Sequence, residues 1–250
     1  MKKLLLIAGA AVGLVAAAVV AVIVIQLLRS DDPNLATEAP AIVSPTTGAS
    51  GATAGNATAT PGSNDGAAAS LPEGVRHFVI VSEESEAKYV VRESLRGLNS
   101  NAVGTTRTIE GEVFLTEAGL SDAGKSAFRV DLSTLQSDEG MRDNYIKRNT
   151  LQTNQYQYAE FVIEAVSGFP AGYVQDTEVE MTIAGTLTIR DVSMPVMWAV
   201  KARQLGDTLT AVADLTITFR DFGMSPPSVP IATAEDEILL QVVLVAREGA

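Results

Sequence analysis

The sequence predicts an all-β domain of eight or nine antiparallel strands with one short helix, preceded by a membrane-spanning helix and a linker. From residue 74 onward, apolar and polar residues alternate with a period of two in most segments. Clusters of Gly, Asn, Asp and Pro separate these segments. No second set of amphipathic helices is available to cover the apolar strand faces. These faces must therefore meet across an interior, in a barrel or in a sandwich.

The chain begins with a segment typical of an uncleaved membrane anchor. An apolar run from Leu4 to Leu28 follows Lys2 and Lys3. Its 25 residues would span about 38 Å as a helix, against about 30 Å for the hydrocarbon core of a bilayer. No small-x-small cleavage site follows the run, and the preceding lysines favour a cytoplasmic N-terminus. We therefore expect residues 1–29 to form a cytoplasmic tip and a transmembrane signal-anchor, with the remaining chain at the cell surface or in the periplasm.

Residues 30–73 have the composition of a flexible linker. Ala, Thr, Gly, Ser, Pro and Asn dominate, and large apolar residues are almost absent. Such a segment cannot bury enough apolar surface to offset the entropy lost on ordering. We therefore expect a disordered linker, acting either as a tether that lifts the next domain off the membrane or as a spacer without a specific role.

The folded domain covers residues 74–250. In residues 179–189, for example, large apolar side chains alternate with Glu and Thr at every position except 184 and 185. The last strand is apolar on both sides apart from Gln241, so we expect it to pack under the short helix. The predicted strands are 76–81, 87–93, 108–115, 127–132, 159–165, 179–189, 194–202, 209–219 and 238–246. The clusters that indicate turns between them include 98–101, 167–170, 206–207 and 225–227.

Residues 137–148 change to helical spacing. Ser137 is a suitable N-cap, and two acidic residues follow it in the first turn, where the helix dipole favours negative charge. Met141, Tyr145 and Arg148 follow at spacings of three and four, so their side chains share one face. The stretch lies between two predicted strands, and we expect it to form the one short helix of the domain.

Three sequence blocks occur in an order that carries a family resemblance. The first is VDLSTLQSDEGMRDNYI, containing Arg142 and Asp143, followed by QYQYAEF with Tyr158 and Phe161. The second is GTLTIRDVSMPV and the third is LTITFRDFGM. Together these blocks resemble the YceI-like family of polyisoprenoid-binding, lipocalin-like barrels, and the resemblance extends over about residues 74–248.

The resemblance implies an antiparallel eight-stranded lipocalin-like barrel with a short capping helix. It also implies an apolar tunnel that takes an isoprenoid chain, such as a quinone tail or a polyprenyl lipid. Alternation alone leaves open whether the interior is a tunnel or a filled core, because an eight-stranded barrel can be either. The candidate interior residues are Val113, Phe128, Val130, Phe161, Ile163, Met181, Ile183, Trp198, Leu215 and Phe219. The capping helix would carry Met141, Arg142, Asp143 and Tyr145.

Arg142 and Asp143 match the Arg-Asp pair of the family. We expect them to hold the capping helix to a strand end, and contact with a ligand head group is the alternative. The sequence departs from the family at Tyr145, where a histidine is common, and at residues 190–193, where a glycine-led turn is common. Both departures fall near the expected mouth of the barrel, so they concern the head group more than the fold.

Composition argues against several classes of function. A net charge of −12 disfavours nucleic acid, which requires clustered Lys and Arg. The absence of cysteine excludes disulfides and thiolate chemistry. There is one histidine, His77, and no recognisable catalytic motif. Most carboxylates fall on the polar strand faces. We therefore expect neither an enzyme nor a metal site, and no cofactor other than a bound lipid; the oligomeric state stays open.

The sequence therefore predicts a membrane-tethered extracytoplasmic protein that carries or sequesters an isoprenoid or a related amphiphilic lipid. A ligand-free β-domain that serves as a cell-surface interaction module is the first alternative. A hydrolase with carboxylates in the barrel mouth is the second. A filled interior would favour the module, and two carboxylates converging inside a cavity would favour the hydrolase.

Overall fold

The computed structural model describes residues 35–42, 71–95, 98–170 and 172–249. The predicted membrane anchor and most of the predicted linker lie outside the described residues. Within the described ranges, no helix is both long enough and apolar enough to cross a membrane.

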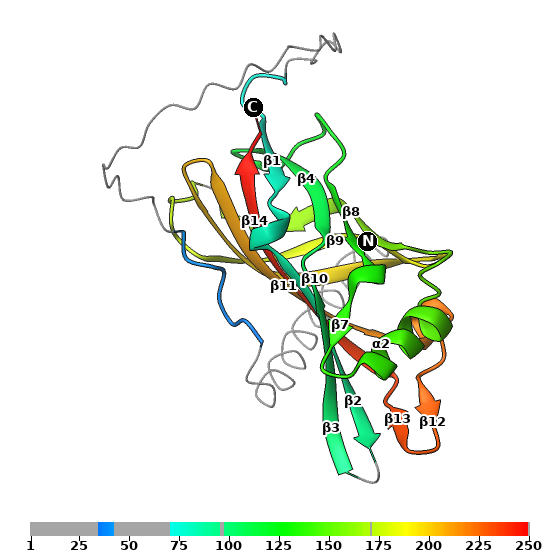
Figure 1. Cartoon of the computed structure of the whole chain (residues 1–250). Helices are drawn as coiled ribbons and strands as arrows, with labels where there is room; N and C mark the ends of the chain where they lie inside the picture. The colour runs from blue at the N-terminus through cyan, green and yellow to red at the C-terminus, as the bar shows by residue number, and fades with distance from the viewer. Residues whose placement is uncertain (1–34, 43–70, 96–97, 171, 250) are drawn as a thin grey trace, which may run out of the picture.

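Within the described ranges, eight strands form a closed antiparallel ring, in the order β1, β4, β6, β8, β9, β10, β11 and β14, and β14 pairs again with β1. This confirms the predicted eight-stranded antiparallel barrel (Figure 1). The bounds of these strands are β1 Arg76–Ile80, β4 Ile109–Thr116, β6 Ala127–Asp131, β8 Tyr158–Ser167, β9 Val179–Ile189, β10 Val192–Leu205, β11 Thr208–Thr218 and β14 Glu237–Glu248.

Further elements extend the wall at one end of the barrel, which we call the mouth end. Strand β2 pairs with β3 along one edge, and along its other edge it pairs first with β14 and then, through its last three residues, with β13. Figure 1 shows the β2–β3 and β12–β13 hairpins and the helix α2 gathered at this end, away from β1. The bounds are β2 Glu86–Leu95, β3 Leu98–Thr106, β7 Gln136–Ser137, α2 Gly140–Tyr145, η3 Ile146–Thr150, β12 Ser228–Val229 and β13 Ala232–Ala234. Short elements complete the described chain: η1 Ser82–Glu84, β5 Gly119–Leu120, η2 Leu132–Thr134 and η4 Arg220–Phe222.

Strand β3 was not predicted, because its first residues read as a turn. Leu98 to Asn101 instead pair with the last residues of β2 and are exposed. Neither face of this extension is buried, so the apolar alternation that identifies a strand is missing there. Alternation returns only at Ala102, whose side chain is buried.

The short helix begins two residues later than predicted. Its N-cap is Glu139, whose carboxylate accepts a hydrogen bond from the Met141 amide at 3.0 Å. Ser137 lies in β7 instead, where its hydroxyl bonds to Asp143 at 2.6 Å. A serine this close to a helix start can satisfy either role, and the pairing of β7 with β3 decides between them.

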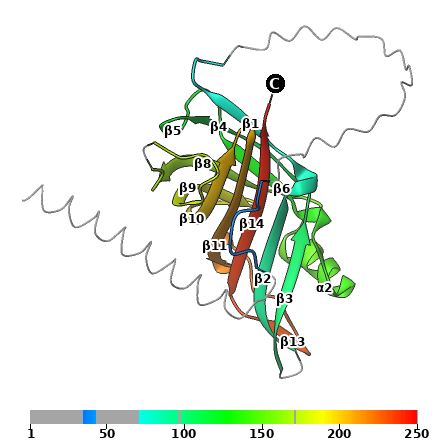
Figure 2. The same ribbon diagram turned by 90° about the vertical axis from the view of Figure 1, so that its left-hand side faces the viewer.

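Residues 35–42, which fall within the predicted linker, pack against the barrel, and we call this segment the strap. Leu35 is buried against Val90 and Leu239 on the outer face of the barrel. Gln241 donates to the Ala36 carbonyl at 3.0 Å and accepts from the Ala36 amide at 2.8 Å. The outer face of β14 therefore packs under the strap and not, as we expected, under the short helix; Figure 2 shows the strap in blue beside β14.

Candidate functional site

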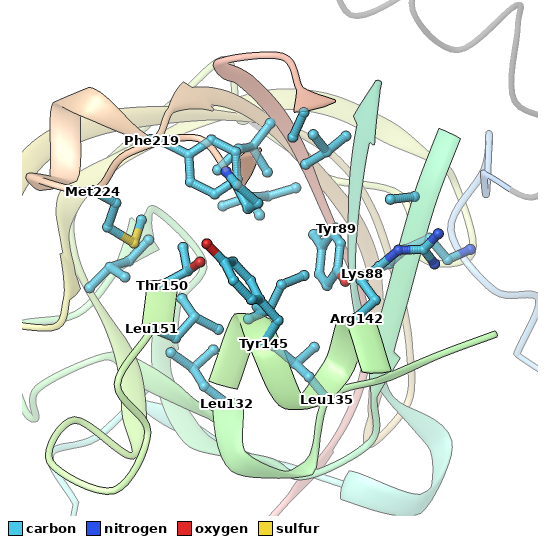
Figure 3. A pocket seen from close by; sticks show the side chains of 18 of the residues that line it. Lys88, Tyr89, Leu132, Leu135, Arg142, Tyr145, Thr150, Leu151, Phe219 and Met224 are labelled. Atoms are coloured by element: carbon cyan, nitrogen blue, oxygen red, sulfur yellow. The ribbon is translucent and has the colours of Figure 1, made fainter. Parts of the chain in front are cut away.

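The mouth end of the barrel contains an apolar cavity of about 790 Å³. Ligand pockets commonly measure about 300–1,000 Å³, so this one is large enough for a small amphiphile. The walls come from β2, β6, β8, β9, β11 and β14, and α2 and η3 close part of the opening. Figure 3 shows Tyr145 reaching from α2 into the cavity, with Tyr89 and Phe219 on the walls.

Three aromatic rings form the floor of the cavity. Phe128, Phe161 and Trp198 contact one another, with ring centroids 5.4–6.4 Å apart. Gly185 makes room for them, because a Cβ on it would overlap the Phe161 ring and the Val162 carbonyl. The Trp198 side chain is only 3% exposed, and its indole Nε1 is buried without a hydrogen-bond partner. The floor is therefore apolar apart from one unused N–H donor.

Half of the predicted interior residues line the cavity. These are Phe128, Val130, Phe161, Trp198 and Phe219. Leu215 instead belongs to the buried core beyond the floor, and Ile163, Met181 and Ile183 are partly buried against that core. Val113, which pairs with the buried Phe78, is half-buried and also lies away from the cavity. These five do not line this cavity, because alternation identifies the inward face but not the depth at which packing closes the interior.

A β-bulge in β8 explains a further error of register. The pairing of β8 with β9 shifts between Ile163 and Ala165, so Glu164 is the extra residue. Beyond it Ala165 pairs with Ala184 and is exposed, although alternation with Phe161 and Ile163 would place its side chain inward. A bulge exchanges the two faces of a strand and leaves no clear signal in the sequence.

Arg142 ties the helix α2 to the barrel wall. Its guanidinium lies 2.8 Å from Glu93 on β2 and 2.5 Å from Asp138. Burial lowers the pKa of Arg142, but these two carboxylates outweigh it and raise that pKa overall. Asp143 accepts hydrogen bonds from the Ser137 amide and hydroxyl on β7. The expected attachment of the helix to strand ends is therefore present, through both members of the pair.

The charged groups at the mouth are mostly carboxylates. Glu93, Asp138 and Glu139 line the opening, and Arg142 is already paired with two of them. Lys88 also borders the cavity, but its ammonium lies 3.8 Å from Glu86. In the described residues no group of His, Asp and Glu side chains could hold a metal ion.

The capping residues contribute to the site unequally. Tyr145 lines the cavity, whereas Met141 lies at its edge and is 77% exposed. The predicted shared face with Arg148 is interrupted, because after Tyr145 the α-helix gives way to the wider π-helical turn of η3. The single histidine lies outside the cavity, stacked on Phe114 with the ring centroids 4.5 Å apart and bonded to Glu112.

Sequence reasoning missed several cavity residues. Tyr89 alternates with Ala87 and Val91 on the predicted strand 87–93, so its inward direction was available from the pattern. Burial raises the pKa of Tyr89 to about 12. Other missed lining residues come from connections and from the later strands, namely Leu132, Leu135, Ile146, Leu151, Leu187, Ile189, Ile217, Met224, Ile238, Leu240 and Val242.

Comparisons with known proteins agree with this architecture. The structure of BcnA from Burkholderia cenocepacia has 20% sequence identity and a TM-score of 0.53, covering 66% of this chain and 98% of that one. A domain from Saccharophagus degradans, described as polyisoprenoid-binding and implicated in plant cell wall breakdown, has 14% identity and a TM-score of 0.55, covering 70% and 99%. Identities this low show a shared fold.

No curated protein is detectably similar to this chain in sequence. The sequence profile of the YceI-like domain, however, matches residues 78–246, which include all the barrel strands except the ends of β1 and β14. This match spans well over half of the 250 residues. The chain therefore belongs to the YceI-like family.

Proposed function

We propose that this protein is a membrane-tethered extracytoplasmic binding protein that holds an isoprenoid or a related amphiphilic lipid, for carriage or sequestration without chemistry. The observation that supports this most directly is the apolar cavity of about 790 Å³ above the Phe128–Phe161–Trp198 floor. A filled interior, as the alternative of a ligand-free interaction module requires, would not leave such a space.

The cavity suits the chain of the lipid. Each CH₂ group removed from water contributes about 0.8 kcal/mol, so affinity comes mainly from the buried length of the chain. The floor lies deep in the barrel and the polar groups lie at the mouth. The chain end therefore points at Trp198, and the head group remains beside Arg142 and Tyr145.

The mouth suits a neutral head group better than a phosphate. The Arg142 guanidinium already forms ion pairs with Glu93 and Asp138, and Glu139 adds a third carboxylate at the mouth. A phosphate would have to compete with these carboxylates for one cation and would be repelled by them. Among the ligands that the family resemblance implies, a quinone or a polyprenyl alcohol therefore fits this mouth better than a polyprenyl phosphate.

The tether is the apolar run from Leu4 to Leu28, which has the length and composition of a membrane span. Two lysines before it favour a cytoplasmic N-terminus and a barrel on the other side. Selective labelling of lysines from outside intact cells tests this topology. Labelled barrel peptides and unlabelled Lys2 and Lys3 are expected, and the reverse pattern would contradict it.

The single tryptophan allows a direct test of binding, because Trp198 lies on the cavity floor. The full chain in phosphatidylcholine vesicles is titrated with a quinone that carries a short isoprenoid tail, and tryptophan emission is followed. We expect saturable quenching. Ala159→Phe, which fills the cavity, should abolish the saturable part. Ala184→Phe is the matched control, because Ala184 pairs with the exposed Ala165 and Met197 on the outer face.

Equal, non-saturable quenching in all three proteins would mean that the quinone merely collides from the bilayer, and the carrier function would be rejected. A geranylgeranyl phosphate competitor then tests the head group. We expect it to displace the quinone less effectively than geranylgeraniol does, and the opposite order would contradict the assignment of a neutral head group.

A further inference from the structure

The apolar side chains exposed at the surface of this barrel are concentrated around the mouth. Nine large apolar side chains are exposed in the described residues, and five of them border the cavity. Two are strongly exposed, Leu98 at 74% and Met141 at 77%. The five residues, which we call the rim, are Leu98, Met141, Tyr145, Val229 and Ile231. They come from the β2–β3 hairpin, α2 and the β12–β13 hairpin, which meet only at the mouth end (Figure 1).

A concentration of apolar groups on a solvent-exposed protein surface marks a site of contact with a partner or a membrane. The path of the strap indicates that the membrane is the one in contact with the rim. The strap contacts Leu239 and Gln241 at its start, beside the cavity-lining Leu240. Towards its end, Thr210 donates to the Pro40 carbonyl at 2.8 Å, near the β10–β11 turn at the opposite end of the barrel. The strap therefore runs from the mouth end towards the opposite end of the barrel.

This path shortens the connection between the apolar N-terminal run and the mouth. Leu28 ends that run, and Leu35 is already fixed to the barrel. Seven residues of fully extended chain span at most about 25 Å, from 3.3–3.6 Å per residue. Without the strap, the first fixed point would be the start of β1 at Arg76, almost fifty residues beyond the run and at the far end of the barrel.

We propose that the rim rests in the surface of the bilayer and that the strap holds the mouth there, so that a lipid passes between bilayer and cavity without crossing water. This inference rests on the membrane anchor of the proposed function. The contact is apolar and not electrostatic, because the mouth carries Glu93, Asp138 and Glu139 against Arg142 and the chain has a net charge of −12. A zwitterionic lipid surface is therefore the partner that fits.

The absence of cysteine makes the test clean, because one introduced cysteine carries one probe. The full chain is placed in phosphatidylcholine vesicles with an environment-sensitive fluorophore at Ile231→Cys or, as a control, at Val174→Cys. Val174 is 68% exposed but lies in the β8–β9 connection, at the other end of the barrel. We expect lipids with a quencher on the acyl chain to quench the probe at residue 231 at least threefold more than the probe at residue 174.

The strap is tested in the same samples. Leu35→Asp places a charge in the buried contact with Val90 and Leu239 and should reduce quenching at residue 231 to the level at residue 174. Thr37→Asp is the matched control, because Thr37 is exposed, and it should leave quenching unchanged. Circular dichroism of each variant confirms that the barrel is folded.

The two proposals fail in different ways. Equal quenching at residues 231 and 174 in a folded chain would overturn rim docking, whatever the tryptophan titration shows. A chain that does not remain with the vesicles on flotation would overturn the anchor and the docking together. Strong rim quenching without saturable quinone binding would keep the docking and reject the lipid carrier.

Discussion

Arg142 is held between two carboxylates at the point where the helix α2 meets the barrel wall. Arg142→Ala leaves the Glu93 carboxylate, whose side chain is only 10% exposed, without its cation. An unpaired buried polar group costs about 1–3 kcal/mol, so we expect unfolding by urea to show a loss of this size. Arg148→Ala, on the exposed part of the same helical segment, should change stability by less than about 0.5 kcal/mol.

The bound lipid should be the same in Arg142→Ala and in the unmodified protein, as identified by mass spectrometry after organic extraction. A different lipid with unchanged stability would show that Arg142 reads the head group and does not hold the helix.

Tyr89 gives the protein a characteristic loss of stability in alkali. Burial raises its pKa from 10 to about 12, so the unfolded chain ionises first. The resulting stabilisation is complete below pH 10 and is lost as the pH rises to about 12. At about 1.4 kcal/mol per pKa unit it amounts to roughly 2–3 kcal/mol.

Urea unfolding of Tyr89→Phe and of the unmodified protein, compared at several pH values, measures this contribution. Between pH 10 and pH 12 the unfolding free energy of the unmodified protein should fall relative to that of Tyr89→Phe, which cannot ionise at this position. Parallel curves across that range would show that Tyr89 is not buried as described.

At the level of single residues, sequence reasoning found the inward face but not the shape of the space inside it. Phe128, Phe161 and Trp198 line the cavity, and alternation points to them because large apolar residues on alternating positions face inward. Met181 and Ile183 point inward too, yet they pack against the core below the floor. The boundary between cavity and core depends on how three rings and Gly185 fit together, and no single strand carries that information.

Strands β8 and β9 approach each other closely where Gly185 faces Phe161. Gly185→Ala would bring a methyl group against the Phe161 ring and the Val162 carbonyl. Overpacking of this kind costs about 1–3 kcal/mol, so the urea midpoint should fall. Gly140→Ala is the contrasting change, because no atom lies within 4 Å of its added Cβ at the start of α2. It should be neutral or slightly stabilising; equal losses in both would refute this account of Gly185.

Among the elements, sequence reasoning predicted the strands that have one apolar and one polar face. It missed the segments that are held mainly by backbone hydrogen bonds. The alternation in β9 and β11 predicted both strands to within a residue. The strap gave no comparable signal, because Ala36 and Ala39 are fixed largely through their backbone amides, to Gln241 and Glu178. Backbone hydrogen bonds do not depend on the residue type that makes them. The one available indication was Gln241, a lone polar residue in an apolar strand.

Occupancy of the cavity should stabilise the molecule as a whole. A ligand that binds only the folded state adds about 2.7 kcal/mol at a concentration one hundred times its Kd. For a domain of this size that corresponds to a rise in Tm of about 5–10 °C. Circular dichroism melting of the lipid-stripped chain, with and without a short-tailed quinone, measures the shift. No shift in the unmodified chain, or an equal shift in Ala159→Phe, would exclude binding in the cavity.

Closure of the barrel depends on β14, which pairs with β11, β2 and β1. This strand ends at Glu248, so it is among the last parts of the domain to leave the ribosome. Until then β11, β2 and β1 each lack a neighbour, and the barrel cannot close. The nascent domain therefore stays incompletely folded throughout its synthesis. A premature stop before residue 237 should therefore produce fragments with unpaired strand edges, which are prone to aggregate.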